Sequence, residues 1–142
     1  MRIACFAAFG FTLVTATANC AGAQTATPPC HGTQQPKMVA ELMFGRDIGV
    51  GRNIGVSESE WQRFVARELV SRFPDGLTIM DAVGQWRDHD GKIVHEPSKH
   101  VEIVLPGNKD DDAHLDAVVD AYKSAFHQHS VGVIVRPACV AF

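Results

Sequence analysis

The stretch VSESEWQRFVAREL, residues 56–69, contains the clearest helix start in this chain and orders the segments on either side of it. Ser57 suits the N-cap position, and Glu60 three positions later completes a capping box. In such a box each side chain accepts a hydrogen bond from the other residue's backbone N–H. Apolar residues then recur at helical spacing as far as Arg72, just before a proline. We predict a helix over this span, with its apolar stripe buried.

Extended segments lie on both sides of this helix. Residues 38–44 alternate between an apolar face and a mixed face, which is typical of a strand. Residues 77–87 and 92–105 flank a turn signal at residues 88–91 and predict a hairpin. Pro97 falls within the second arm, where we expect a bulge or a break because proline cannot donate to the ladder.

A second helix and a last strand follow the hairpin. The acidic run at residues 110–112 precedes an apolar stripe of period 3.6, so it indicates a helix start rather than a cation site. Residues 131–135 are β-branched and apolar, and Pro137 indicates an edge strand. The order βαββαβ predicts an α+β fold, the ferredoxin-like sandwich, with a four-stranded antiparallel sheet and two helices on one face.

This fold leaves the other face of the sheet uncovered. Its two central strands are the first strand and the second arm of the hairpin, which present Glu41, His100 and Glu102 on the uncovered face. Two interpretations stay open for these side chains. They form either a solvated face or dimer contact, or a catalytic pair.

The first 23 residues have the three parts of a signal peptide: a charged start, an apolar run and a small-residue cleavage site ending at Ala23. A lipoprotein signal at Cys20 fits less well, because Asn19 stands where a small residue is needed. We expect residues 24–37 to be a flexible lead-in and residues 38–142 to form one domain. No other stretch approaches the roughly 20 apolar residues of a transmembrane helix. The expected location is therefore the periplasm or the extracellular medium.

Cysteines and charge narrow the function classes. Cys30 and Cys139 remain after cleavage of the leader, and an oxidising compartment favours a disulfide between them. The 13 basic and 16 acidic residues include no basic stripe, so nucleic-acid binding is not expected. The spacing of the seven histidines, such as His127 and His129 two apart, does not suit a metal site. We expect no metal and no cofactor.

Several ordered motifs resemble a known bacterial family, catalogued as domain of unknown function 3574. They are Phe44-Gly45-Arg46, Val56-Ser57 with Glu60-Trp61, the block from Arg72 to Thr78, Gly84-Gln85-Trp86-Arg87 and Glu96-Pro97-Ser98-Lys99. The resemblance covers residues 38–142 and implies a small exported protein, with a signal peptide or lipoprotein leader. It implies no activity and no catalytic residue.

The same motifs supply the candidate ligand-binding residues. Arginine and lysine near strand ends and turns can converge on a carboxylate or phosphate, and tryptophan can stack on a flat ligand. The candidates are Arg46, Arg72, Asp75, Trp86, Arg87, Glu96 and Lys99, with Arg52 as a further cation in the glycine-rich loop. Alternatively, Arg72 and Asp75 pair to brace a turn and Trp86 belongs to the core or to an interface.

Two functions fit these observations. The first is a binding or interaction module, whose partner is a small anionic molecule or a protein, including a second copy across the open sheet face. The alternative is a small enzyme with a pocket around Arg72, Asp75, Trp86 and Glu96, in which a carboxyl acts as acid or base. The shape of the site distinguishes them, because converging polar groups in a hollow favour chemistry and a flat apolar face favours partners.

Overall fold

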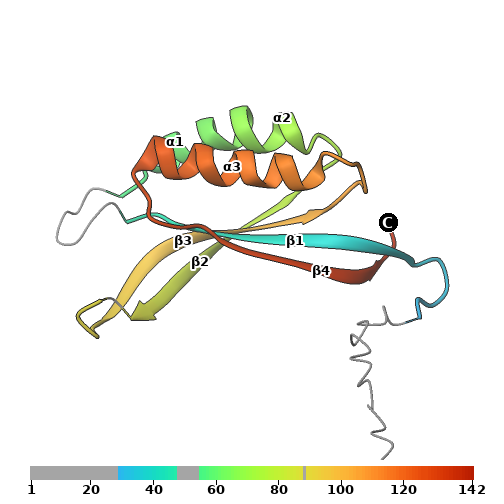
Figure 1. Ribbon diagram of the computed structural model, residues 1–142, viewed down its shortest axis with the longest axis horizontal. Coiled ribbons are helices and arrows are strands. Elements are labelled where there is room, and N and C mark those ends of the chain that lie inside the picture. Colours follow the sequence, from blue (N-terminus) through green and yellow to red (C-terminus); the bar gives the residue numbers. More distant parts are fainter. Residues whose placement is uncertain (1–28, 48–54, 88) are drawn as a thin grey trace, which may run out of the picture.

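Four strands form one antiparallel sheet in the order β2-β3-β1-β4, and the helices cover one of its faces (Figure 1). The computed structural model describes residues 29–47, 55–87 and 89–142. The elements are β1 (Gln35–Gly45), α1 (Glu58–Phe64), the π-helix η1 (Val65–Leu69), α2 (Val70–Arg72), β2 (Thr78–Arg87), β3 (Ile93–Val104), α3 (Asp111–Phe126) and β4 (Gly132–Val140). This arrangement confirms the predicted fold. The predicted signal peptide lies outside the described residues.

The first helix begins as the capping box predicts. The Glu60 backbone N–H donates to the Ser57 hydroxyl, and the Ser57 backbone N–H donates to the Glu60 carboxylate at 2.9 Å. The helical run also ends at Arg72 as expected, but its middle five residues are a π-helix that the sequence did not lead us to predict.

A four-residue repeat explains the π-helix. The buried side chains Trp61, Val65, Leu69 and Phe73 recur every fourth residue. In an α-helix of 3.6 residues per turn, such a repeat drifts around the axis by about 40° per step. The i→i+5 bonds of η1 widen one turn and return the stripe to the sheet. Burial of this stripe therefore decides the local helix type.

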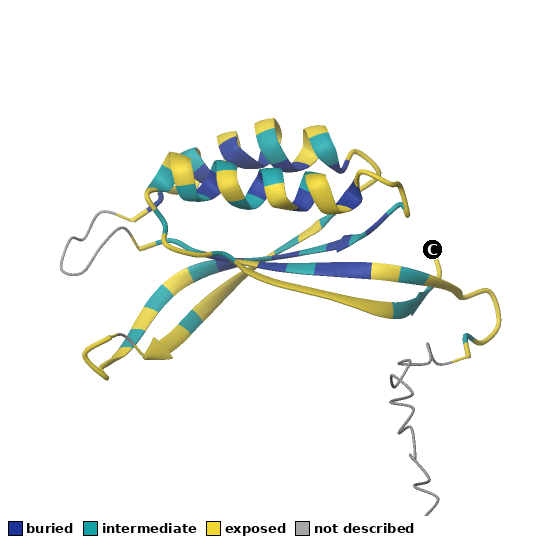
Figure 2. Cartoon of the chain, viewed as in Figure 1, coloured by how far each residue is buried: buried dark blue, intermediate teal, exposed yellow. Residues whose placement is uncertain are grey.

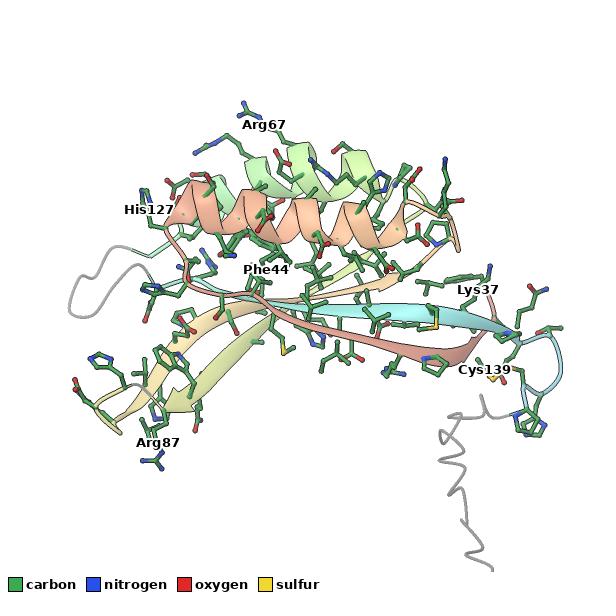
Figure 3. All side chains as sticks on the ribbon, viewed as in Figure 1. Lys37, Phe44, Arg67, Arg87, His127 and Cys139 are labelled. Atoms are coloured by element: carbon green, nitrogen blue, oxygen red, sulfur yellow. A yellow bond between two sulfur atoms is a disulfide. The ribbon has the colours of Figure 1, made fainter. Side chains whose placement is uncertain are left out.

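The core lies between the helices and the inner face of the sheet, and Phe44 occupies its centre (Figure 3). Its ring centroid lies 5.2 Å from that of Trp61, 5.9 Å from that of Phe64 and 4.7 Å from that of Tyr122. Edge-to-face and tilted contacts at such distances are favourable between aromatic rings. Phe44 thus joins β1 to both helices.

The hairpin corrects one prediction. The β2–β3 register runs unbroken from Thr78↔Glu102 to Arg87↔Ile93, so Pro97 makes neither a bulge nor a break. Its carbonyl accepts from the Arg46 N–H at 2.9 Å, and a residue in an antiparallel ladder directs both backbone groups to the same neighbour. The nitrogen of Pro97, which carries no hydrogen, therefore faces the end of β1, where the hydrogen-bond ladder between β1 and β3 stops.

Beyond Pro97, no third strand among the described residues pairs with the hairpin. Ser98 is the last residue of β3 that pairs with β1, opposite Gly45, and the rest of the hairpin bends away from the body (Figure 1). We call residues 83–97 the hairpin arm. Its residues are mostly exposed, as are the first six residues of β4, whereas the last three residues of β4 are partly buried (Figure 2).

A disulfide holds the other end of the sheet. Cys30 and Cys139 are bonded, 109 positions apart in sequence, which confirms the predicted pair. Cys139 is near the end of β4, and β4 is an edge strand as Pro137 indicated. None of the helices in the described part of the chain is long and apolar enough to cross a membrane.

Candidate functional site

The structure distributes the predicted site residues over three places. Arg72 and Asp75 precede β2, whereas Trp86 and Arg87 lie at its far end, ten residues of extended chain away. Arg72 pairs with Glu68 at 2.6 Å rather than with Asp75, because residues i and i+4 are neighbours on a helix. The proposed turn brace between Arg72 and Asp75 is therefore wrong.

Arg87 belongs to the tip of the hairpin arm. Its guanidinium donates to the Gly91 carbonyl at 2.6 Å, and Figure 3 shows it at the lower end of the arm. The remaining candidates, Arg46, Trp86, Glu96 and Lys99, surround the point where the arm leaves the body. Arg52 lies outside the described residues.

Lys99 lies on the helix-facing side of this junction. It is 5% exposed, and its Nζ contacts the Asp81 carboxylate at 2.6 Å and the Glu58 carboxylate at 2.9 Å. Arg46 contacts the same Glu58 carboxylate at 3.2 Å. Two cations and two carboxylates thus neutralise each other at the start of α1.

The pKa of Lys99 reflects this arrangement. Hydrogen bonding to Asp81 raises the pKa of the ammonium group most, and Glu58 adds to the rise, against a lowering by burial. Lys99 therefore stays charged over the physiological pH range, and the carboxylates of Asp81 and Glu58 balance its charge.

Glu96 lies on the opposite, uncovered side of the junction. Two glycines leave room for it: a Cβ on Gly45 would lie 2.7 Å from its carboxylate, and one on Gly84 would lie 3.3 Å from its Cγ. The Trp86 indole N–H donates to its Oε1 at 3.1 Å. We call Gly45, Gly84, Trp86 and Glu96 the Glu96 notch.

The carboxyl in this notch has a raised pKa. Burial is the main cause and the charge of Asp47 adds to it, while hydrogen bonds from the Asp47 backbone N–H and from Trp86 act in the opposite direction. Burial disfavours the carboxylate because it removes water from the charge. Such an environment is common for acids, bases and ligand-binding carboxyls.

The centre of the uncovered face carries a second polar group. Glu41 Oε1 accepts from the Arg136 guanidinium at 2.8 Å, and its Oε2 lies 3.4 Å from His100 Nε2. Glu102 lies opposite Glu41 in the register and on the same face. The structure therefore places Glu41, His100 and Glu102 where the sequence predicts.

Apolar side chains surround this group. Met43 and Met80 lie on either side of His100 in one row across three strands, and Ile134 lies opposite Glu41 on β4. All three are exposed, at 39–46% of their full area. The uncovered face is thus a mixed surface with an apolar band.

The described hollows lie elsewhere. One of about 280 Å³ separates α1 and η1 from α3 and is lined by Arg63, Arg67, Ala121 and Ala125 among others. A second of similar size borders the start of β1, at Lys37 and Pro106. Neither includes a predicted site residue. Across the described ranges, no three His, Cys, Asp or Glu side chains gather at a spacing that could hold a metal ion.

Sequence reasoning missed Asp81 and Glu58 as partners of Lys99. A signal for Asp81 was present, since a turn centred on residue 90 pairs it directly with Lys99. No such rule predicts Glu58, which comes from the helix layer. The Tyr122 hydroxyl, which donates to the Gly45 carbonyl at 2.8 Å, was also missed because this contact spans 77 positions.

Fold and surfaces together define a ferredoxin-like α+β domain, tied by one disulfide and open on one face of its sheet. The chain belongs to the family described as Protein of unknown function (DUF3574), whose family model matches residues 39–142. This confirms the resemblance noted in the sequence. No curated protein sequence matches the chain.

Solved structures with a similar fold include two of a phage SAM lyase. The complex with S-methyl-5'-thioadenosine has 17% identity and a TM-score of 0.56, and the match covers 83% of this chain and 97% of that one. The apo structure has 19% identity and a TM-score of 0.53, with 75% and 82% covered. At these identities the likeness shows the fold alone.

Proposed function

We propose that this protein is an exported interaction module that associates with a second copy of itself through the uncovered face of its sheet. The observation that carries the proposal is the exposed band of Met43, Met80 and Ile134 on a face that none of the described helices covers. Large apolar side chains gathered on a flat surface are typical of protein contacts. The disulfide supports export, because such bonds persist in oxidising compartments.

The size of the face suits a stable contact. Strand β1 has 11 residues, about 36 Å at roughly 3.3 Å per residue, and four strands about 4.8 Å apart are about 19 Å wide. The product is about 700 Å², close to the roughly 800 Å² that each partner buries in a standard interface. This area already includes the strand residues of the hairpin arm.

The surface also favours a partner like itself. It carries both signs of charge, with Arg136 and His100 beside Glu41, so two copies related by a two-fold axis can place opposite charges together. The hairpin arm exposes Val83 at 71% and Trp86 at 48% on opposite faces. A two-stranded ribbon is only marginally stable alone in water, so a second chain that covers it would stabilise it.

Sedimentation velocity of the purified protein tests this proposal. We expect a species heavier than the 15.4 kDa chain at micromolar concentration, and a monomer for Met80→Glu and Ile134→Glu. Val70→Glu is the matched control, since Val70 on the helix layer is 46% exposed, as is Ile134. A monomeric wild type, or association that survives both glutamates, would contradict the proposal.

The alternative is a small enzyme, and one observation favours it. Glu96 has a raised pKa and lies beside an exposed tryptophan, as an acid or base that acts on a bound ligand would. The separation of Arg72 and Asp75 from Trp86 limits such a site to the Glu96 notch. Ligand binding there is therefore the first question for this alternative.

A further inference from the structure

The cations near the arm already have partners within the protein. Lys99 and Arg46 share the Glu58 carboxylate, and Lys99 also binds Asp81. Arg87 donates to the Gly91 carbonyl. An anionic ligand would have to compete with these contacts, so the arrangement of these charges does not favour an anionic ligand.

Glu96 differs from these cations, because its hydrogen-bond partners are uncharged groups. Its carboxyl accepts hydrogen bonds from Trp86 and from the Asp47 backbone, both neutral donors, and no ion pair joins it to a lysine, arginine or histidine in the described ranges. Asp47 adds negative charge nearby. A half-buried carboxylate that has no cationic partner among the described residues is costly, and a positively charged ligand would remove that cost.

Trp86 supplies the second half of a cation site. Its ring is held by the 3.1 Å hydrogen bond from Nε1 to Glu96 Oε1, and 48% of the residue is exposed. This hydrogen bond places the carboxylate at the N–H edge of the ring, so a cation that contacts the carboxylate must approach over the exposed ring face to lie within about 6 Å of the ring centroid, the range of a cation–π interaction. The indole is the strongest natural partner in such contacts.

We propose that the Glu96 notch binds a small organic cation, an ammonium group held between the Glu96 carboxylate and the Trp86 indole. A metal ion fits less well, since calcium and magnesium require several oxygen ligands and an aromatic face offers none. The site lies at the base of the hairpin arm, where Gly45 and Gly84 leave the space that the Glu96 side chain occupies. Glu96 and Trp86 come from one chain, so the site needs no second copy, but a copy that covers the hairpin arm would compete with the ligand.

Calorimetric titration of the purified full chain with choline chloride tests this inference. The neutral isostere 3,3-dimethyl-1-butanol and sodium phosphate are the comparison ligands, at constant ionic strength. We expect choline to bind, the isostere to bind at least about tenfold more weakly, and phosphate not to compete. Binding should weaken as pH falls through the raised pKa of Glu96, since the protonated carboxyl carries no charge.

Two variants locate the site. Glu96→Gln keeps an oxygen that can accept from Trp86 and should lower choline affinity about tenfold or more, as should Trp86→Leu. Asp75→Asn makes the same change from carboxylate to amide just before the start of β2, at the opposite end of the strand from Trp86, and should leave affinity unchanged. Thermal unfolding of each variant confirms that it is folded. No choline binding, equal binding of the isostere, or equal affinity in Glu96→Gln would each overturn the proposal.

Discussion

Replacement of Lys99 separates the contribution of its charge from that of its packing. Lys99→Met keeps a buried chain of similar length but loses the contacts to Asp81 and Glu58. The side chains of these carboxylates are 85% and 55% exposed, so water can solvate them in the variant. Each pair is therefore closer to a surface pair, about 0.2–1 kcal/mol, than to a buried pair, about 3–5 kcal/mol. We expect a loss of about 1 kcal/mol.

Lys99→Ala also removes three buried methylene groups. At about 0.8 kcal/mol each these contribute about 2.4 kcal/mol, so the total loss should be about 3 kcal/mol. Urea unfolding at pH 7, followed by circular dichroism, measures both variants against the wild type. Equal losses of 3 kcal/mol or more in Met and Ala variants would refute the argument, since the charge pairs would then behave as buried ones.

The pH dependence gives an independent check. Because the folded protein raises the pKa of Lys99 above its ordinary value of 10.5, folding favours the protonated amine. This stability is fully present below pH 10.5 and is lost as pH rises through the raised pKa. Lys99→Met should not lose stability as pH rises through this range. Unfolding curves of the variant and the wild type, measured at a series of pH values from 9 upwards, show the difference.

Three further predictions concern the disulfide, the core and the notch. Cys30→Ser should lower the free energy of unfolding by about 4–5 kcal/mol, measured in urea, because the bond closes a loop of over 100 residues in the unfolded chain. Phe44→Ala should cost about 3–5 kcal/mol in the same assay, since it empties the centre of the aromatic core. The wild type should lose stability as pH rises from below 4.5 through the raised pKa of Glu96, because folding favours the protonated carboxyl. Glu96→Gln should not show this loss. Melting temperatures that change with pH identically in both proteins would contradict this prediction.

Local chemistry made much of the fold predictable. The capping box at Ser57 depends on two residues three positions apart, and the hairpin depends on one turn, so both follow from neighbouring residues. Pro97 was misjudged because its effect depends on where β1 ends, which is not local. The π-helix was missed because the sheet, rather than helix propensity, selects the face that a four-residue repeat must present.

The candidate site was only partly predictable. Motif proximity suggested one pocket for Arg72, Asp75, Trp86 and Glu96, but a ten-residue strand holds its two ends far apart. The cations have carboxylate partners within the protein, which changes the expected ligand from an anion to a cation. The sequence did not show this, because Glu58 meets Lys99 only when the helix packs on the sheet. Charge in the sequence alone does not show which charges remain unpaired.

By itself the sequence determined the order of elements, the ferredoxin-like class, the family and the cysteine pair, because periodicity, caps and turns act over a few residues. Of the four cysteines, only two lie outside the predicted signal peptide, and these allow one pairing. Only the tertiary structure decided which polar groups neutralise each other and which remain at the surface. Such contacts join residues far apart in the chain, and their energies depend on burial, which arises when helices cover one face of the sheet and leave Glu96, Trp86 and the apolar band on the other.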